Sequence, residues 1–164
     1  MEQLTLFGSS VQPPHKYIID TCSIFSQKDT NPNRRDVFKS LWSYIDSLVR
    51  EKIIVTCSEI VEELRDDKLM MGWIKEVECV ILPVDERVQN NVTKIVTTHP
   101  KLVDFKQIKS SSDAFLIATA MAHGLIIVTE EDKKSYKKIP QVAASFGVES
   151  LNIIELCAKE GKEF

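Results

Sequence analysis

The order of apolar and polar residues along the chain predicts strands and helices that alternate. Predicted strands, each built around apolar residues typical of strands buried on both faces, lie within residues 16–20, 52–57, 79–84, 125–129 and near 150–154. Apolar residues recur at helical spacing between them, at residues 36–49, 58–67, 69–77, 85–98 and 110–123. Buried strands separated by helices favour a parallel sheet covered on both faces. The predicted fold class is therefore α/β, with three layers (α/β/α) around a central parallel sheet of about four to five strands.

The expected helix ends follow from local signals. In the helix over residues 36–49, Val37 and Phe38 fall on the apolar face that is expected to be buried. The helix over 58–67 is expected to begin with a capping pattern at Thr56–Glu59. The helix over 110–123 is almost wholly apolar and should be buried, with Gly124 as its stop.

The first residues of the chain differ in composition from the rest. Residues 1–15 contain Gly8 and the pair Pro13-Pro14, which predicts a flexible N-terminal tail before one domain at residues 16–164. Within this tail Gln3–Phe7 ("QLTLF") is apolar at alternate positions and resembles the short peptide by which bacterial replication proteins bind the sliding clamp. An added edge strand is the alternative role for these residues.

Charge and cysteine usage narrow the range of functions. The 164-residue chain has a formal net charge of −3, so a nucleic-acid partner would require local lysines and arginines or metal ions. The four cysteines show no CxxC or zinc spacing and are expected to be reduced. There is no signal-peptide pattern, and the longest apolar run, Ala114–Val128, is too short to span a bilayer. We expect a cytoplasmic protein without a membrane partner.

Carboxylates follow the predicted strands at the edge where sites of parallel α/β proteins form. Asp20 comes directly after the first strand, and "TEED" (residues 129–132) follows the fourth. Asp113 opens the buried helix before that fourth strand, and Glu63 lies in the helix that leaves the second. Acids gathered at one edge repel one another unless a hard divalent cation is bound, so the pattern indicates Mg²⁺ or Mn²⁺ and phosphodiester hydrolysis.

Each acid also has a structural alternative. Asp20 is also suited to stabilising a turn, and Asp113 to capping its helix. Glu63 lies beside the buried stripe of its helix, whereas Glu62 points away from that stripe, so Glu63 is preferred. Within "TEED", Glu131 is preferred as the site residue. The alternative is that these acids stabilise the N-terminus of a helix through its dipole.

Together these segments resemble the PIN domain, a family of metal-dependent ribonucleases. The matching stretches are "YIIDTCSIF", "TCSEIVEEL", "SDAFLIATA" and "IIVTEED". The ending "KKIPQVAASFGVESLNIIEL" resembles a bacterial subgroup of PIN-like proteins. The resemblance implies a PIN-like domain at residues 16–164, with Asp20, Glu63, Asp113 and Glu131 as catalytic, metal-binding acids. It also implies an RNA substrate, and it raises an antitoxin partner and a homodimer, since many bacterial members have them.

Two positions depart from the family pattern. Cys22 stands where Asn or Ser is common, and Lys133 stands where another acid is common. We interpret Cys22 as a small core residue and not a nucleophile, because the sequence places neither a base nor a helix N-terminus beside it to lower the pKa of its thiol. The lysines of "KKSYKK" (Lys133, Lys134, Lys137 and Lys138) are candidates for RNA contact or form a solvated charge run.

Two other functions compete with the ribonuclease. The first is a PIN-like protein-interaction module whose degenerate acids no longer hold a metal ion. The second is a phosphatase with an aspartate nucleophile of the DxD type, which is disfavoured because position 22 is Cys and not Asp.

Overall fold

A computed structural model describes residues 14–99, 111–136 and 138–164. Within these ranges, five strands form one parallel sheet in the order β3-β2-β1-β4-β5. The strands are β1 (Tyr17–Ile19), β2 (Ile54–Cys57), β3 (Ile81–Leu82), β4 (Ile126–Val128) and β5 (Ser150–Leu151). The predicted α/β class and parallel sheet are confirmed.

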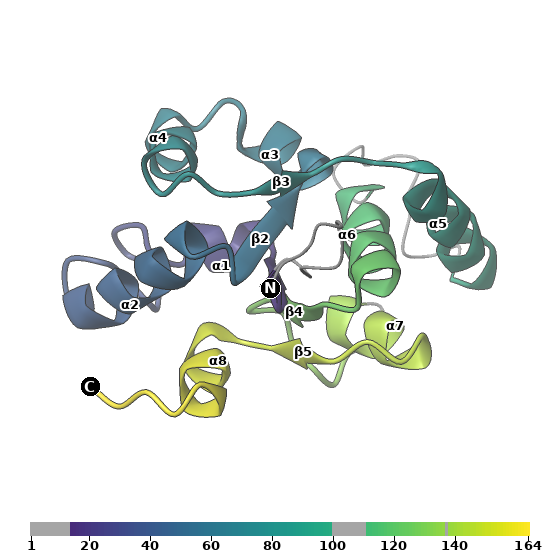
Figure 1. The fold of residues 1–164 in the computed structure, drawn as a ribbon. Helices are drawn as coiled ribbons and strands as arrows, with labels where there is room; N and C mark the ends of the chain where they lie inside the picture. The colour runs from purple at the N-terminus through teal and green to yellow at the C-terminus, as the bar shows by residue number, and fades with distance from the viewer. Residues whose placement is uncertain (1–13, 100–110, 137) are drawn as a thin grey trace, which may run out of the picture.

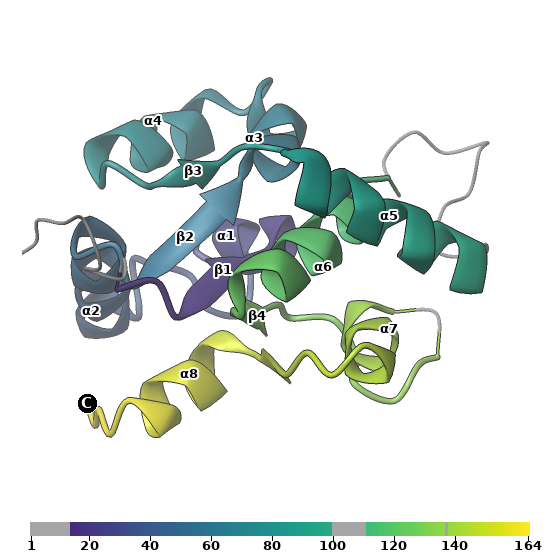
Figure 2. The same ribbon diagram turned by 45° about the vertical axis from the view of Figure 1, so that its right-hand side comes forward.

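Helices cover both faces of the sheet. They are α1 (Thr21–Phe25), α2 (Lys39–Arg50), α3 (Ser58–Leu64), α4 (Lys68–Glu76), α5 (Glu86–Thr98), α6 (Ser111–His123), α7 (Ile139–Ser145) and α8 (Ile153–Lys159). Figures 1 and 2 show α2, α4 and α8 on one side of the sheet and α5, α6 and α7 on the other. The predicted three-layer arrangement is therefore present.

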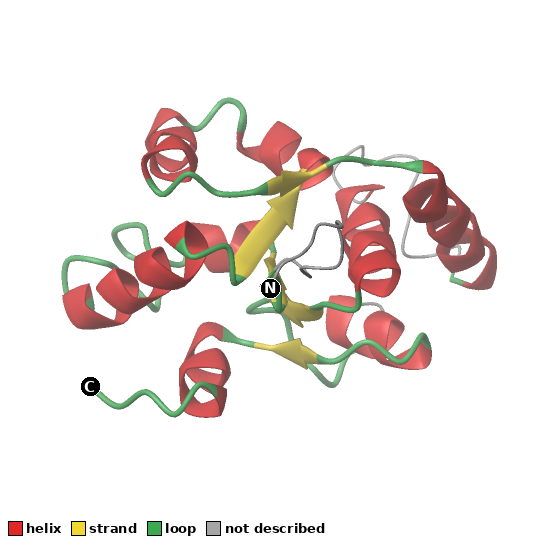
Figure 3. Cartoon of the chain, viewed as in Figure 1, coloured by secondary structure: helices red, strands yellow, loops and turns green. Residues whose placement is uncertain are grey.

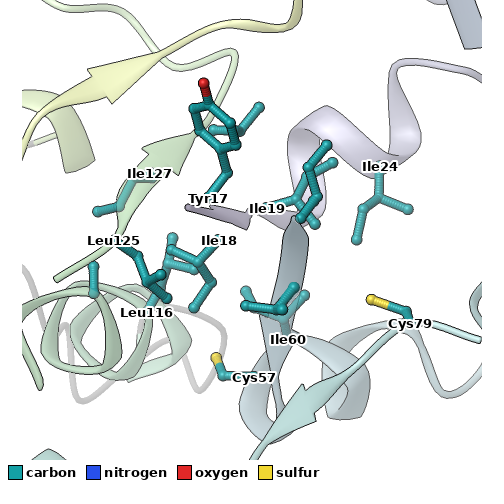
Figure 4. Close-up of a cluster of buried hydrophobic side chains, with 14 of the residues drawn as sticks. Tyr17, Ile18, Ile19, Ile24, Cys57, Ile60, Cys79, Leu116, Leu125 and Ile127 are labelled. Carbon is teal, nitrogen blue, oxygen red and sulfur yellow. The ribbon is translucent and has the colours of Figure 1, made fainter. Parts of the chain in front are cut away.

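The strands are buried because apolar side chains occupy both of their faces. Ile18 of β1 pairs with Val55 of β2 and with Ile127 of β4, and all three are fully buried. Leu116 of α6 belongs to the same buried cluster, which Figure 4 shows around β1. This core fixes the carboxyl end of β1, where Asp20 follows.

Two expectations about helix ends are wrong. The helix predicted over residues 36–49 begins only at Lys39, and Val37 and Phe38 are 62% and 44% exposed. The chain before α2 instead forms turns, in which the indole Nε1 of Trp42 donates to the carbonyl oxygen of Asn33 at 2.5 Å. These turns hold residues 37 and 38 outside the helix and away from the core.

The predicted capping pattern of α3 is the second error. The residue that precedes α3 is Cys57, whose side chain makes no capping hydrogen bond. The hydroxyl of Thr56 donates instead to the carbonyl oxygen of Ile19, at 3.0 Å. Thr56 therefore ties β2 to β1 and does not cap the helix.

Two short helices, α1 and α7, were not predicted, and Figure 3 shows both at the positions labelled in Figure 1. Each begins with a hydrogen bond from a backbone N–H to a carboxylate that the sequence pattern assigns to the candidate site. Asp20 accepts from the N–H of Thr21 in α1, and Glu131 accepts from the N–H of Ile139 in α7. Five to seven residues carry too little periodicity to reveal a helix.

Several sequence-based predictions lie outside the described residues. They concern most of the N-terminal tail, including Gln3–Phe7, and the lysine at position 137. Across the described ranges, no helix combines the length and apolar character needed to cross a bilayer. The four cysteines are free thiols, as predicted.

Candidate metal centre

Asp20 lies where β1 ends and α1 begins. Its backbone N–H donates to the carbonyl oxygen of Val128, at 2.9 Å, so the neighbouring strand β4 sets its position. Asp20 is the residue that directly precedes α1, and its Oδ1 caps the helix by accepting from the N–H of Thr21 at 2.8 Å. Asp20 is only 3% exposed, which makes it a buried carboxylate at the carboxyl edge of the sheet.

Two further donors hold the other oxygen of Asp20. The hydroxyl of Thr129 donates to Oδ2 at 2.9 Å, and the thiol of Cys22 donates to the same atom at 3.0 Å. The pKa of Asp20 is raised to about 6, chiefly by burial and also by the charge of Glu131, although its hydrogen bonds lower it. Asp20 is thus oriented by its neighbours and also lies within the field of a second acid.

Asp113 lies in the first turn of α6, and its pKa depends on the charges of the other three acids. Its pKa is raised to about 8, chiefly by burial and then by the charges of Asp20, Glu131 and Glu63. Lys138 acts in the opposite direction and lowers this pKa. Carboxylates from four separate segments are therefore close enough to repel one another at this edge, as the sequence pattern predicts.

Glu63 reaches this edge from α3. Its Oε1 accepts a hydrogen bond of 2.5 Å from the hydroxyl of Thr21, the first residue of α1. The adjacent Glu62 instead pairs with Arg65, at 3.1 Å, on the exposed surface. The structure thus separates the two glutamates in the way that the helical spacing predicts.

The three acids of "TEED" also differ in their contacts. Glu131 accepts at Oε1 from the N–H of Ile139, at 3.0 Å, and its charge acts on both Asp20 and Asp113. Asp132 is exposed and accepts from the backbone N–H of Lys134 at 3.0 Å. Of these two, Glu131 is the acid that faces the other candidates.

Glu130 is occupied by structural hydrogen bonds. Oε2 accepts from the hydroxyl of Ser23 at 2.8 Å and from the N–H of Ile153 at 3.1 Å. Oε1 accepts from the side-chain amide of Asn33 at 3.2 Å. Glu130 therefore joins α1 to the start of α8.

The donor chemistry of the four acids suits a hard divalent cation. Oxygen ligands are those preferred by Mg²⁺ and Mn²⁺, and a cation would relieve the repulsion that raises the pKa of Asp113. Within the described ranges, however, no group of three or more His, Cys, Asp or Glu residues is arranged to hold a metal ion. Glu63 and Glu131 are each held by a hydrogen bond from a protein donor. The acids fit a cation by their chemistry, but they are not assembled into a coordination shell.

Two residues of this network were missed or misread in the sequence. Thr129 is 2% exposed, and its hydroxyl donates to Asp20 and accepts from the N–H of Glu131 at 3.2 Å. Cys22 is half-buried and contacts Asp20, so its interpretation as a core residue is wrong. Burial and the charge of Asp20 raise the pKa of the Cys22 thiol, which disfavours a nucleophilic role. The sequence signal for Thr129 is its position: it is a polar residue that directly follows the fourth strand, at the edge where the acids are expected.

The lysines next to the site differ in what they contact. Lys133 forms an ion pair with Glu155 of α8, with 2.6 Å between Nζ and Oε2. Lys134 and Lys138 are exposed, and neither has an ion pair within the described residues. Lys133 is therefore the least available of the three for RNA contact.

The parallel sheet, its two helical layers and the acids at its carboxyl edge define an α/β protein with the PIN-like fold. A family model described as "Domain of unknown function (DUF4411)" matches residues 17–164. The chain belongs to this family.

Solved structures with the same fold support this class. FitAcB from Neisseria gonorrhoeae is 24% identical with a TM-score of 0.54, and the match covers 84% of this chain and 98% of that chain. VapBC2 from Rickettsia felis, bound to a DNA fragment from its promoter, is 16% identical with a TM-score of 0.55, covering 83% and 97%. No curated protein matches the chain. At these identities the likeness establishes the fold.

Proposed function

We propose that the protein is a metal-dependent endoribonuclease that hydrolyses RNA phosphodiester bonds. The observation that carries this proposal is the approach of four acids to one edge of the sheet: Asp20, Glu63, Asp113 and Glu131. The charges of the other three acids act on Asp113, and the charge of Glu131 also acts on Asp20. The fold shared with the FitAcB and VapBC2 structures supports a nuclease of the toxin type. The PIN-like subgroup resembled by the C-terminal sequence is part of the same proposal.

The chain's own residues prepare this edge for a cation and a phosphate. Asp20 is oriented by Thr21, Cys22 and Thr129, so that its carboxylate is set before any ligand binds. Bound Mg²⁺ or Mn²⁺ would supply an activated water and a contact to the phosphate oxygens. Asp113 would release its proton when the cation binds, because a metal ligand must be deprotonated.

RNA cleavage in the presence of Mn²⁺ or Mg²⁺ tests the ribonuclease directly. We expect the wild type to cleave and the Asp20→Asn and Asp113→Asn variants to lose at least about 100-fold in rate, since even residues that only support metal ligands contribute 10–100-fold. Chelation should stop cleavage by the wild type. Cleavage retained by both variants would contradict the proposal.

A non-catalytic interaction module is the second candidate. It is favoured by the finding that no group of His, Cys, Asp or Glu in the described residues is arranged to hold a metal ion. Calorimetry separates the two functions: Mn²⁺ binding that Asp113→Asn abolishes supports the enzyme. A folded wild type that binds no Mn²⁺ supports the module.

We further propose an antitoxin partner, because the similar structures FitAcB and VapBC2 are complexes. We also propose a homodimer, because many bacterial members of the PIN family that the sequence resembles form one. The protein encoded beside this chain should co-purify with it and inhibit RNA cleavage. Light scattering of the isolated chain tests the homodimer. A monomer that cleaves RNA regardless of the neighbouring protein would refute both proposals.

A further inference from the structure

A pocket distinct from the candidate metal centre lies between α2, α4 and the turns that follow α1. Its volume is about 880 Å³, which is in the range of small-molecule sites. Gln27 and Arg35 line it from the turns, Lys39 from the start of α2, and Gly72 and Trp73 from α4. None of the four candidate metal ligands belongs to its lining. The proposed cleavage of RNA therefore gives this pocket no role.

One buried polar atom of the pocket lining lacks a partner. Gln27 is only 5% exposed, and its Oε1 accepts from Nε and Nη2 of Arg35, at 3.1 and 2.9 Å. These bonds fix the orientation of the amide, so Nε2 is a donor, and it has no hydrogen-bond partner among the described residues. A buried N–H without an acceptor is costly to the fold. A ligand with a carbonyl or ring-nitrogen acceptor would supply the missing bond.

Gly72 gives the pocket a wall without a side chain. It lies in the middle of α4, where glycine is unfavourable relative to alanine. Apart from its chain neighbours and the backbone of its own helix, no described atom lies within 4 Å of where its Cβ would be. Packing within the chain therefore does not require glycine here. Leu69, on the same face of the helix, is 67% exposed, so this wall suits a flat apolar ring that lies against α4.

Two lysines of the pocket lining are available to an anion. Lys39 is the first residue of α2, and Phe38 before it makes no side-chain capping bond, so the positive end of the helix dipole is uncapped. Lys68 is the first residue of α4. Both lysines are exposed, and neither has an ion pair in the part of the chain that the structure describes. A phosphate is the anion that helix N-termini and lysines bind together.

The acids of the pocket lining are of two kinds. Asp36 and Asp46 are each paired with an arginine, at 2.7 and 2.8 Å, so their charges are neutralised. Asp29 and Glu76 are exposed and have no ion pair within the described ranges. Carboxylates of this kind accept hydrogen bonds from amino and ring N–H groups. The pocket thus offers a flat wall, one donor, acceptors at its rim and cations for a phosphate.

We propose that this pocket binds a nucleoside phosphate. The base lies against Gly72 and accepts a hydrogen bond from Nε2 of Gln27, and its own N–H groups donate to Asp29 or Glu76. The phosphate lies at Lys39 and the start of α2. This site goes beyond the proposed ribonuclease function and does not depend on it.

Binding is measured with the full chain in the presence of a chelator, so that no cation bridges a phosphate to the acids. The probes are the monophosphates of adenosine, guanosine, cytidine and uridine, each compared with its nucleoside and with inorganic phosphate. Calorimetry and tryptophan fluorescence are the readouts, since Trp73 lines the pocket. We expect at least one nucleotide to bind about ten-fold more tightly than its nucleoside or phosphate alone. Phosphate that binds as tightly as every nucleotide would reveal a simple anion site and overturn the proposal.

Two substitutions test the wall and the donor. Gln27→Glu keeps an acceptor for Arg35 but replaces the unpaired donor with an oxygen, and it should weaken nucleotide binding about ten-fold. Gly72→Ala should also weaken binding, while it raises the melting temperature because alanine favours the helix. A loss of affinity in a more stable protein is not caused by misfolding. Unchanged binding by both variants would refute the proposal.

Lys39→Ala should weaken nucleotide binding about ten-fold, because it removes a cation at the phosphate. Lys75→Ala is its matched control, since Lys75 is an exposed lysine of α4 outside the pocket lining. The control should bind nucleotide like the wild type. Equal losses in the two variants would mean that only the general charge of the protein attracts the nucleotide, which refutes the site.

Asp113→Asn separates this pocket from the candidate metal centre. The variant should bind nucleotide like the wild type, whether or not the protein cleaves RNA. Loss of binding in this variant would place the nucleotide at the acids and refute the proposal. No binding of any of the nucleotides at millimolar concentration would refute it too. In that case, protection of the pocket from hydrogen exchange by the co-purified partner protein would identify it as a protein-docking site.

Discussion

Asp20 and Glu63 are both proposed metal ligands, but the fold holds them in different ways. Asp20 follows a central strand, is 3% exposed, and accepts hydrogen bonds from Thr21, Cys22 and Thr129. Glu63 lies on the exposed surface of α3, and among the described residues its side chain has one hydrogen bond, from Thr21. Asp20 is therefore positioned before a cation binds. Glu63 can change its conformation when its hydrogen bond from Thr21 is replaced by a contact to the cation.

This difference indicates how the site assembles. A preorganised ligand loses little conformational entropy on binding, whereas an exposed side chain loses rotamer freedom when it becomes fixed. Substitutions that disturb the support of Asp20 should therefore cost more than those that remove Glu63. The following predictions test this order, beginning with the largest effect.

Thr129→Val removes the hydroxyl that supports Asp20 while preserving the shape of the side chain. We expect Mn²⁺ affinity and kcat/KM for RNA cleavage to fall about 100-fold, at the upper end for residues that orient metal ligands. Thr129→Ser keeps the hydroxyl and should restore both values to within a few-fold. Calorimetry and cleavage assays measure the effects, and thermal melting checks that each variant is folded. If Thr129→Val binds Mn²⁺ like the wild type, Asp20 does not depend on this support.

Glu63→Gln should have a smaller effect, about ten-fold in Mn²⁺ affinity, because Asp20, Asp113 and Glu131 remain as acidic ligands. Glu62→Gln is its matched control, since Glu62 is the adjacent glutamate and pairs with Arg65 on the surface. The control should bind Mn²⁺ and cleave RNA like the wild type. Equal losses in the two variants would mean that α3 contributes general negative charge and not a specific ligand.

The sequence predicts the position of the acids better than their support. Strands that run parallel end at one edge, so the order of elements is enough to bring Asp20 and Glu131 together. The link through Thr129 depends on the register in which Ile19 pairs with Val128, because that register places Asp20 beside Thr129. Pairing between strands more than 100 residues apart leaves no local signal, so the hydrogen bonds of this corner appear only in the structure.

The errors at helix ends have a similar cause. Val37 and Phe38 fit the apolar period of α2, but distant contacts decide where the helix begins. The turns before it are held by the bond from Trp42 to Asn33, and α7 is begun by a bond to Glu131, eight residues earlier. The spacing of apolar residues indicates which face of a helix is buried, but it does not indicate the distant contacts that fix the residue at which the helix begins.

A separate prediction concerns the stability of the metal-free protein and its dependence on pH. The pKa of Asp113 is raised from its ordinary value of 3.8 to about 8, chiefly by burial and then by the other acids. A carboxyl with a higher pKa in the folded state stabilises that state fully below about pH 4, and this contribution is lost as pH rises to about 8. Because the pKa of Asp20 is about 6, the loss between pH 6 and 8 belongs mainly to Asp113.

Asp113→Asn should therefore flatten the fall in stability between pH 6 and 8 by about 2 kcal/mol, at about 1.4 kcal/mol for each pH unit. Urea unfolding in the presence of a chelator measures this difference. Asp66→Asn, a change at an exposed aspartate with no hydrogen bond or ion pair of its side chain in the described residues, should retain the wild-type slope. Saturating Mn²⁺ should stabilise the wild type at pH 8 and leave Asp113→Asn nearly unchanged, since a ligand stabilises only the state that binds it. An Asp113→Asn variant with the wild-type slope would show that Asp113 is ionised without a cation and that the acids lie farther apart than their electrostatics indicate.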